Sequence, residues 1–273
     1  KFVRGLTAED FAVYEDGVQQ AVAFFGATAV PLDLAILLDT SASMTDKIDT
    51  VQQAAVGFAQ TLREGDRLIV VDIKDATKVL HPLDAAPAAA EAAILSTVPR
   101  GGTALYNGLY LTLKEMVKQR RANDEVRRQA IAVLSDGEDT ASLIGFDDVM
   151  AVAKEAGISI YTITLRSGYA IRNATQGGAR RFSQSEFSMK ALAQETGARA
   201  FFPTEIGELA GVYGSIADEL SHLYSIGYSS KNPRRDGAYR RVIVRVAAKP
   251  GAQVRTRAGY QSPRPERVTT STH

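Results

Sequence analysis

Short apolar runs alternate with amphipathic segments along most of this chain, and that alternation constrains its fold more than any other feature. Five of the runs fit buried strands: 32–38, 67–73, 129–135, 158–165 and 198–202. The segments 46–63, 104–120 and 206–223 place apolar residues three and four positions apart, as amphipathic helices do. Such alternation is typical of a parallel sheet with helices on both faces. The sequence therefore predicts an α/β fold with a Rossmann-like, doubly wound, mostly parallel sheet, and residues 76–80 fit a short antiparallel edge strand.

The two ends of the chain have strand patterns of their own. The dipeptide Asp16-Gly17, a strong hairpin signal, separates the strand-like runs 11–14 and 18–25. The strand-like runs near the other end are 224–228, 242–246 and 254–258. Because neither end has enough strands for a separate domain, we expect them to pair in one small β module. The predicted boundaries are 1–30 and 223–262 for this module, 31–222 for the α/β domain and 263–273 for a tail.

One connection inside the α/β region is unusually long and polar. Residues 166–187 are rich in Gly, Arg, Ser and Gln, whereas α/β connections usually span about 2–6 residues. The segment is either a binding loop or a disordered insertion, and the sequence leaves both interpretations open.

Carboxylates and hydroxyls gather where two predicted strands end and where one helix begins. Asp39, Ser41 and Ser43 follow the first apolar run, Asp136 follows the third strand, and Thr103 lies in a glycine-rich turn before a helix. The carboxyl ends of parallel strands share one edge of the sheet, where ligands usually bind. Only hard oxygen ligands are present, and they suit Mg²⁺ or Mn²⁺ better than a soft metal.

Each of these five residues also has an ordinary structural interpretation. Asp39, Ser41, Ser43 and Thr103 could simply cap helices, and Asp136 could serve in a turn. Taken alone, the first cluster is weak evidence for a metal, and the combination of three segments is what favours a site.

Composition excludes several classes of function. There is no cysteine, which rules out disulfides, thiol nucleophiles and cysteine-based metal sites. The chain has three histidines, no G-x-S-x-G elbow and no P-loop, so we expect no enzyme activity. The net charge of +1 gives no field that would attract nucleic acid. No apolar run approaches the ~20 residues of a membrane helix. The chain opens at Lys1 without a signal peptide, so we expect a processed form.

The full motif resembles a known family. Asp39, Ser41, Ser43, Thr103 and Asp136 match the metal-ion-dependent adhesion site (MIDAS) of the von Willebrand factor type A (VWA) domain. Met44 and the run Gly101-Gly102-Thr103-Ala104-Leu105 also fit the sequence pattern of that family. The similarity covers roughly residues 31–220, and the flanking segments resemble bacterial extracytoplasmic proteins described as VWFA-related.

This resemblance implies a metal and a partner. Mg²⁺, or else Mn²⁺ or Ca²⁺, would be held directly by Ser41 and Ser43 and by Thr103 directly or through water. Asp39 and Asp136 would contribute negative charge, often through bridging waters. One open coordination position would take an Asp or Glu carboxylate from a protein or peptide partner. The implied function is a non-enzymatic, metal-dependent adhesion or interaction module that is secreted, periplasmic or on the cell surface.

Other functions remain open from sequence. The same fold and site occur in intracellular adaptors of ATPase or chelatase complexes, although this chain shows no charged linker or second fused domain. A metal-dependent hydrolase is less well supported, since the second position after Asp39 is Ser41 rather than another carboxylate. A degenerate domain that binds no metal would have no reason to keep the full ligand set.

Overall fold

The centre of the molecule is a six-stranded sheet. The computed structural model describes residues 2–27, 30–122, 125–136, 138–165, 183–247 and 251–263. The strands of this sheet are β4 (Leu32–Asp39), β5 (Arg67–Ile73), β6 (Lys78–Asp84), β7 (Arg128–Ser135), β8 (Ser159–Thr164) and β9 (Ala200–Phe201). Their order is β6-β5-β4-β7-β8-β9, and every pair is parallel except the edge pair β5–β6. The predicted mostly parallel sheet with an antiparallel edge strand is confirmed.

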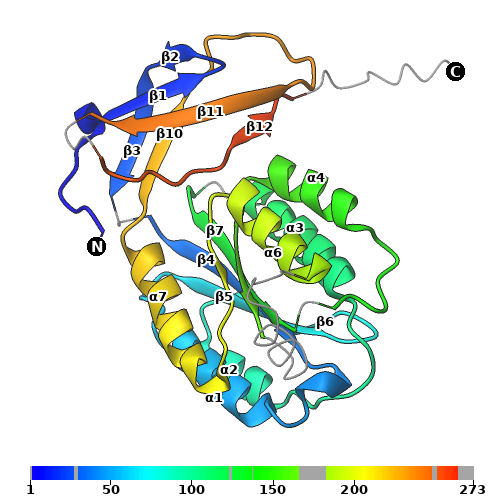
Figure 1. The fold of residues 1–273 in the computed structure, drawn as a ribbon. Coiled ribbons are helices and arrows are strands. Elements are labelled where there is room, and N and C mark those ends of the chain that lie inside the picture. The colour runs from blue at the N-terminus through cyan, green and yellow to red at the C-terminus, as the bar shows by residue number, and fades with distance from the viewer. Residues whose placement is uncertain are drawn as a thin grey trace, which may run out of the picture.

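Helices cover both faces of this sheet (Figure 1). One face carries α1 (Ile48–Ala59), α2 (Pro87–Leu95) and α7 (Leu209–Ser221), and the other carries α3 (Leu105–Arg121), α4 (Phe146–Ala156) and α6 (Gln184–Glu195). Short 3-10 turns add η1 (Ala8–Asp10), η2 (Ala42–Met44) and η3 (Ile206–Glu208). None of the helices in the described part of the chain is long and apolar enough to cross a bilayer.

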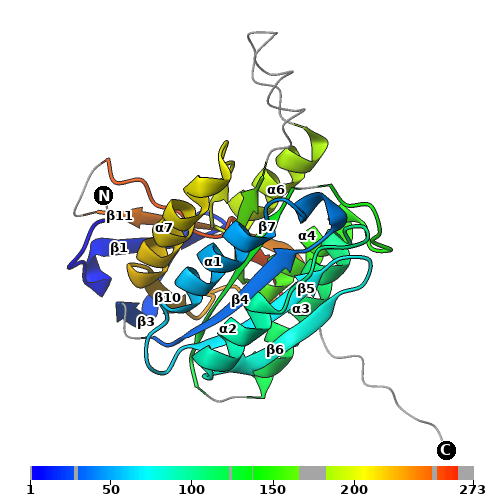
Figure 2. The ribbon, with the colours of Figure 1, turned by 90° about the horizontal axis from the view of Figure 1, so that it is seen from below.

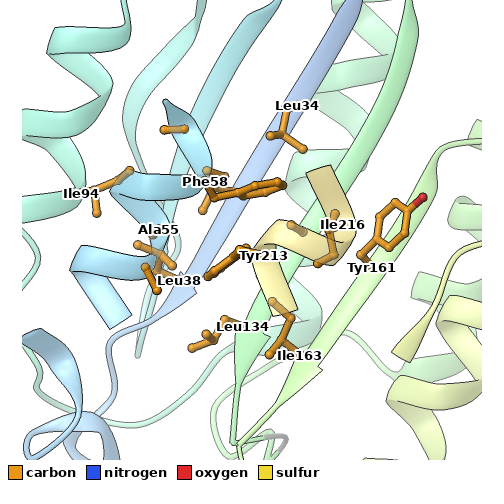
Figure 3. Close-up of a cluster of buried hydrophobic side chains, with 14 of the residues drawn as sticks. Leu34, Leu38, Ala55, Phe58, Ile94, Leu134, Tyr161, Ile163, Tyr213 and Ile216 are labelled. Carbon is orange, nitrogen blue, oxygen red and sulfur yellow. The ribbon is translucent and has the colours of Figure 1, made fainter. Parts of the chain in front are cut away.

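The alternation of side chains along β4 explains these two layers. All eight residues of β4 are buried, which is expected for a central strand covered on both faces. Leu34 and Leu38 pack with α1 and α7, while Leu37 packs with the helices of the opposite face. On the first face the rings of Phe58 and Tyr213 stack at 4.8 Å between centroids (Figure 3). Two cores therefore fix β4 from both sides and hold its carboxyl end in place.

Strands from both chain ends form a separate β module (Figures 1 and 2). One sheet has the order β12-β11-β1-β2, and a second pairs β10 with β3. The strands are β1 (Phe11–Glu15), β2 (Val18–Gln20), β3 (Val22–Ala27), β10 (Tyr224–Tyr228), β11 (Tyr239–Val246) and β12 (Gly259–Gln261). Asp16 and Gly17 have φ of 47° and 83°, as a two-residue type I′ hairpin requires. The predicted pairing of both chain ends is confirmed.

The segment 251–258, which leads from β11 to β12, runs between this module and the α/β domain and contacts both (Figure 1). A Cβ on Gly197 would lie 2.6 Å from the backbone nitrogen of Arg257, so only glycine fits there. Arg255 Nη2 also lies 2.5 Å from Oε2 of the buried Glu219 on α7. Backbone contact and an ion pair therefore fasten the module to the domain.

Several expectations about the elements need correction or stay open. The sequence patterns do not predict helix α2. Helix α6 begins at Gln184, inside the segment 166–187 that is predicted as a polar loop. Residues 166–182 of that segment lie outside the described residues. The predicted strand 254–258 is wrong, because β12 occupies Gly259–Gln261 instead. Most of the predicted tail, from residue 264, also lies outside the described residues. The domain boundaries remain predictions.

Candidate metal centre

The end of β4 places a buried carboxylate at the sheet edge. Asp39 is the last residue of β4 and is fully buried. The Ser135 hydroxyl, at the end of the neighbouring β7, donates to Asp39 Oδ2 at 2.6 Å, and the Ser41 amide donates to Oδ1 at 2.9 Å. Two adjacent strand ends therefore hold both oxygens of Asp39 in fixed positions.

A chain of hydroxyl contacts links Asp39 to a second carboxylate. Ser41, whose amide contacts Asp39, places its Oγ 3.0 Å from Ser43 Oγ. Ser43 Oγ in turn donates to Asp136 Oδ2 at 2.5 Å. The structure thus brings four of the five predicted site residues together across 93 positions of sequence.

Thr103, the fifth residue, lies in a loop that backbone hydrogen bonds hold beside these four residues. The Ala42 amide donates to the Gly101 carbonyl at 3.0 Å, and the Thr103 amide donates to Thr140 Oγ1 at 2.9 Å. Thr103 is buried. Within the described residues, no hydrogen bond joins its side chain to the other four. The structure therefore places Thr103 in the adjoining loop without setting its hydroxyl against a carboxylate.

Glycine is required in the turn before Thr103. Gly101 has φ of +71°, and a Cβ there would lie 1.8 Å from Oδ2 of Asp75. Oδ1 of the same Asp75 accepts the Gly102 amide at 2.6 Å. Asp75 thus holds the glycine turn in place, and no motif in the sequence suggests this role.

Two nearby acidic residues, Asp139 and Asp72, bind other groups of the protein and support the loops around the site. Asp139 accepts the amides of Tyr106 and Ser142 at 2.8 and 3.0 Å, so it caps the first turn of α3 from a separate loop. Asp72 accepts the Thr40 hydroxyl and pairs with Lys74 Nζ at 2.7 Å. These partners leave Asp39 and Asp136 as the carboxylates of the site.

The electrostatics of the site favour a cation. Burial, together with the negative charge of Asp136, raises the pKa of Asp39, although hydrogen bonds from Ser135 and Ser41 oppose that shift. Asp136 Oδ1 is buried and has no hydrogen-bond partner among the described residues. A buried carboxylate oxygen without a partner is costly unless a cation or donor meets it. The residues present therefore fit a small divalent cation bound by oxygens.

The site is rich in hydroxyls rather than in carboxylates or imidazoles. No group of three or more His, Cys, Asp or Glu side chains arranged to hold a metal occurs in the described part of the chain. Ser135 is the contact that the sequence analysis missed. The available signal was a serine closing an otherwise apolar strand one residue before Asp136.

Solved structures share the fold. A von Willebrand factor type A protein from Catenulispora acidiphila superposes with a TM-score of 0.59 at 16% identity, over 78% of this chain and 50% of that one. The vWF domain of the type V pili tip protein Mfa5 from Porphyromonas gingivalis gives 0.53 at 15% identity, over 70% of this chain and 95% of that one. Proximal thread matrix protein 1 from the mussel byssus, with a zinc-occupied MIDAS motif, gives 0.55 at 15% identity, over 75% and 49%.

A protein related in sequence matches a smaller part of this chain than the solved structures do. The "Uncharacterized protein sll0103" of Synechocystis sp. is 35% identical over 114 residues, which are 40% of this chain. The chain spans only 26% of that protein's length and half of the Catenulispora protein. VWA domains commonly mediate metal-dependent protein interactions and are generally non-enzymatic. The model for the von Willebrand factor type A domain matches residues 33–214, more than half of the sequence, and the chain belongs to that family.

Proposed function

We propose that this chain is a protein-binding module that captures an acidic side chain of its partner through a divalent cation at the MIDAS. The observation that carries the proposal is the continuous contact from Asp39 through Ser41 and Ser43 to Oδ2 of Asp136. The other oxygen of Asp136, Oδ1, is buried and has no hydrogen-bond partner among the described residues. Nothing in a purely structural cap would require that oxygen to be buried and unpaired.

Each residue has a distinct part in this function. Ser41 and Ser43 would hold the cation through their hydroxyl oxygens, and Thr103 would do so directly or through water. Asp39 and Asp136 would supply negative charge, while Ser135 fixes the orientation of Asp39. The cation, when bound, offers an open coordination position for a carboxylate. Three of the five ligands are neutral, and the two carboxylates only balance the charge of the cation, so an anionic partner group can complete its coordination.

We assign the site to Mg²⁺ or Mn²⁺ in preference to zinc. Hydroxyl and carboxylate oxygens are hard ligands, and no imidazole or thiolate stands among the five. Zinc occupies the MIDAS of the mussel protein, so zinc is the natural competitor in any binding experiment. We place the module outside the cytoplasm, in keeping with the pilus-tip protein that shares its fold.

Selection from a random peptide library tests the proposal without knowledge of the natural partner. The library is applied to the Mg²⁺-loaded chain, and bound peptides are eluted with EDTA. We expect the eluted peptides to share an Asp or Glu, and a synthetic peptide with that residue changed to Asn or Gln to lose binding. The chain carrying Asp39→Ala should select no peptides.

Asp46→Asn is the matched control, because Asp46 is an exposed carboxylate of the same loop. This variant should keep peptide binding. Peptides that remain bound in EDTA, or that bind equally well after the acid is replaced by its amide, would contradict the proposal.

A further inference from the structure

The β module and the end of α7 surround an open cavity that the MIDAS does not use. The cavity has a volume of about 540 Å³ and lies between the facing sheets of the module and the segment 251–257. Its walls include Phe11 of β1, Ile226 of β10 and Val244 of β11. This volume falls within the ~300–1,000 Å³ of small-molecule sites, and native cores seldom leave so much space unfilled.

The strand walls of the cavity are apolar because side chains alternate along β10 and β11. Val242, Val244 and Val246 project from one face of β11 toward the cavity, and Tyr224 and Ile226 project from β10. Ile226, Val244 and Val246 remain half-buried in the structure, although their positions are those of a core. The inner faces of the two sheets therefore do not fully cover one another.

The hydroxyls of the two tyrosines in the strand walls already have partners. The Tyr224 hydroxyl donates to the Val3 carbonyl and accepts the Leu6 amide, both at 3.1 Å. The Tyr228 hydroxyl donates to Glu15 at 2.9 Å. A polar group buried between the strands would find few partners there and would be unfavourable. The part of a ligand that lies between the strands should therefore be apolar.

Two arginines and the buried carboxylate of Glu219 also line the cavity. Arg255 and Arg257 line it from the exposed segment 251–257. Arg255 pairs with the buried Glu219, whereas no ion pair joins Arg257 to any carboxylate of the described residues. An anionic end group beside Arg257 would meet favourable charge, while its apolar body lay between the sheets.

We propose that the β module binds the aliphatic chain of an anionic amphiphile, with the chain between the two sheets and the head group beside Arg257. Two sources share this chemistry: a free fatty acid and the acyl tail of an anionic lipid. This binding is independent of the metal site, because the cavity contains none of the MIDAS residues.

Displacement of the fluorescent apolar probe N-phenyl-1-naphthylamine from the 273-residue chain, with EDTA present, tests the proposal. We expect saturable probe binding and displacement by fatty acids that strengthens with chain length. The methyl esters, which lack the anionic group, should displace more weakly. Val244→Trp fills the cavity and should weaken both binding and displacement at least tenfold. Val79→Trp, on the exposed edge strand β6, should leave them unchanged.

Co-sedimentation with phosphatidylglycerol vesicles separates the two sources. Fatty-acid displacement together with vesicle binding that Val244→Trp abolishes would assign a lipid tail, and displacement without vesicle binding would assign a free acid. Thermal unfolding must show that Val244→Trp is folded, and Ile226→Phe provides a second, smaller filling of the cavity. Absence of displacement by any chain length, or equal displacement from the cavity-filled variants, would overturn the proposal.

Discussion

Ser43 Oγ donates a hydrogen bond of 2.5 Å to Asp136 Oδ2. This contact joins the loop after β4 to the loop after β7, the neighbouring strand in the sheet. The other oxygen of the Asp136 carboxylate, Oδ1, is buried and has no hydrogen-bond partner in the part of the chain that the structure describes. The contact places two of the proposed ligands side by side at the sheet edge, and it makes the position of one loop depend on the other.

Ser135 should act on the metal through Asp39. Its hydroxyl bond to Asp39 Oδ2 opposes the rise in the pKa of that carboxyl, so Ser135→Ala should raise the pKa further. Because the cation needs the ionised carboxylate, its affinity in the variant should begin to fall at a higher pH than in the wild type. We also expect about tenfold weaker binding at neutral pH, as is usual when a partner of a metal ligand is lost. Mg²⁺ titrations from pH 5 to pH 8 measure both effects, and an unchanged pH profile would exclude this role.

Asp39→Asn should stabilise the metal-free chain while abolishing metal binding. The pKa of Asp39 is raised above its ordinary value of 3.8 by burial and by Asp136. A raised pKa gives stability below that ordinary value and loses it as the pH rises through the folded-state pKa. At neutral pH the buried charge therefore destabilises the apo protein. We expect the melting temperature in EDTA to rise by about 2–4 °C, the shift that ~1 kcal/mol gives in a domain of this size. A lower melting temperature would show that the bonds from Ser41 and Ser135 outweigh the buried charge.

Glu15 should make the β module sensitive to acid. Burial tends to raise its pKa, but hydrogen bonds from Ser230, Tyr260 and Tyr228 and the charge of Arg240 lower it below the ordinary value of 4.5. A lowered pKa gives stability above the ordinary value that is lost as the pH falls through the folded-state pKa. Glu15→Gln should cost ~1–3 kcal/mol at neutral pH, since it weakens bonds to a buried charged acceptor.

Denaturant unfolding at pH 7 and at pH 3.5 tests this role of Glu15. The difference in free energy of unfolding between wild type and Glu15→Gln should shrink at the lower pH. A difference that stays constant between the two pH values would contradict the expectation.

Gly197→Ala should loosen the segment that fastens the β module to the α/β domain. Gly197 has φ of +79°, and its Cβ would lie 2.6 Å from the Arg257 nitrogen, so both the backbone and the contact disfavour alanine. We expect a loss of about 2 kcal/mol or more and faster tryptic cleavage after Arg255 and Arg257. Gly211→Ala, inside α7 with open space around the added Cβ, should instead be neutral or slightly stabilising. Equal cleavage rates in the two variants would show that the contact at Gly197 does not hold the segment 251–258 in place.

The sequence predicted the central sheet well because its strands are buried on both faces. Strand β5 has the predicted bounds, and β4 and β7 differ from prediction by one residue at one end. Helix α2 was missed because its sequence, Pro87 to Leu95, is mostly alanine, so an apolar stripe does not stand out. The strand predicted at 254–258 failed because this segment packs against Gly197 instead of pairing along β11.

The candidate site was largely predictable, and its supporting contacts were not. The ligand residues lie in short motifs, and strand order brings those motifs together. The roles of Ser135 and Asp75 depend on which side chains meet across different loops, which periodicity and spacing do not encode. Whether the five residues hold a metal remains a prediction.

Isothermal titration of Mn²⁺ into the metal-stripped chain tests the central claim most directly. We expect one binding site, strengthened by an acidic peptide from the library selection and lost in Ser43→Ala. Thr45→Ala, which removes an exposed hydroxyl of the same loop, should bind as the wild type does. If the folded wild-type chain binds no Mn²⁺ with or without the peptide, or if Ser43→Ala binds as tightly as Thr45→Ala, the account of a metal-dependent adhesion site is wrong.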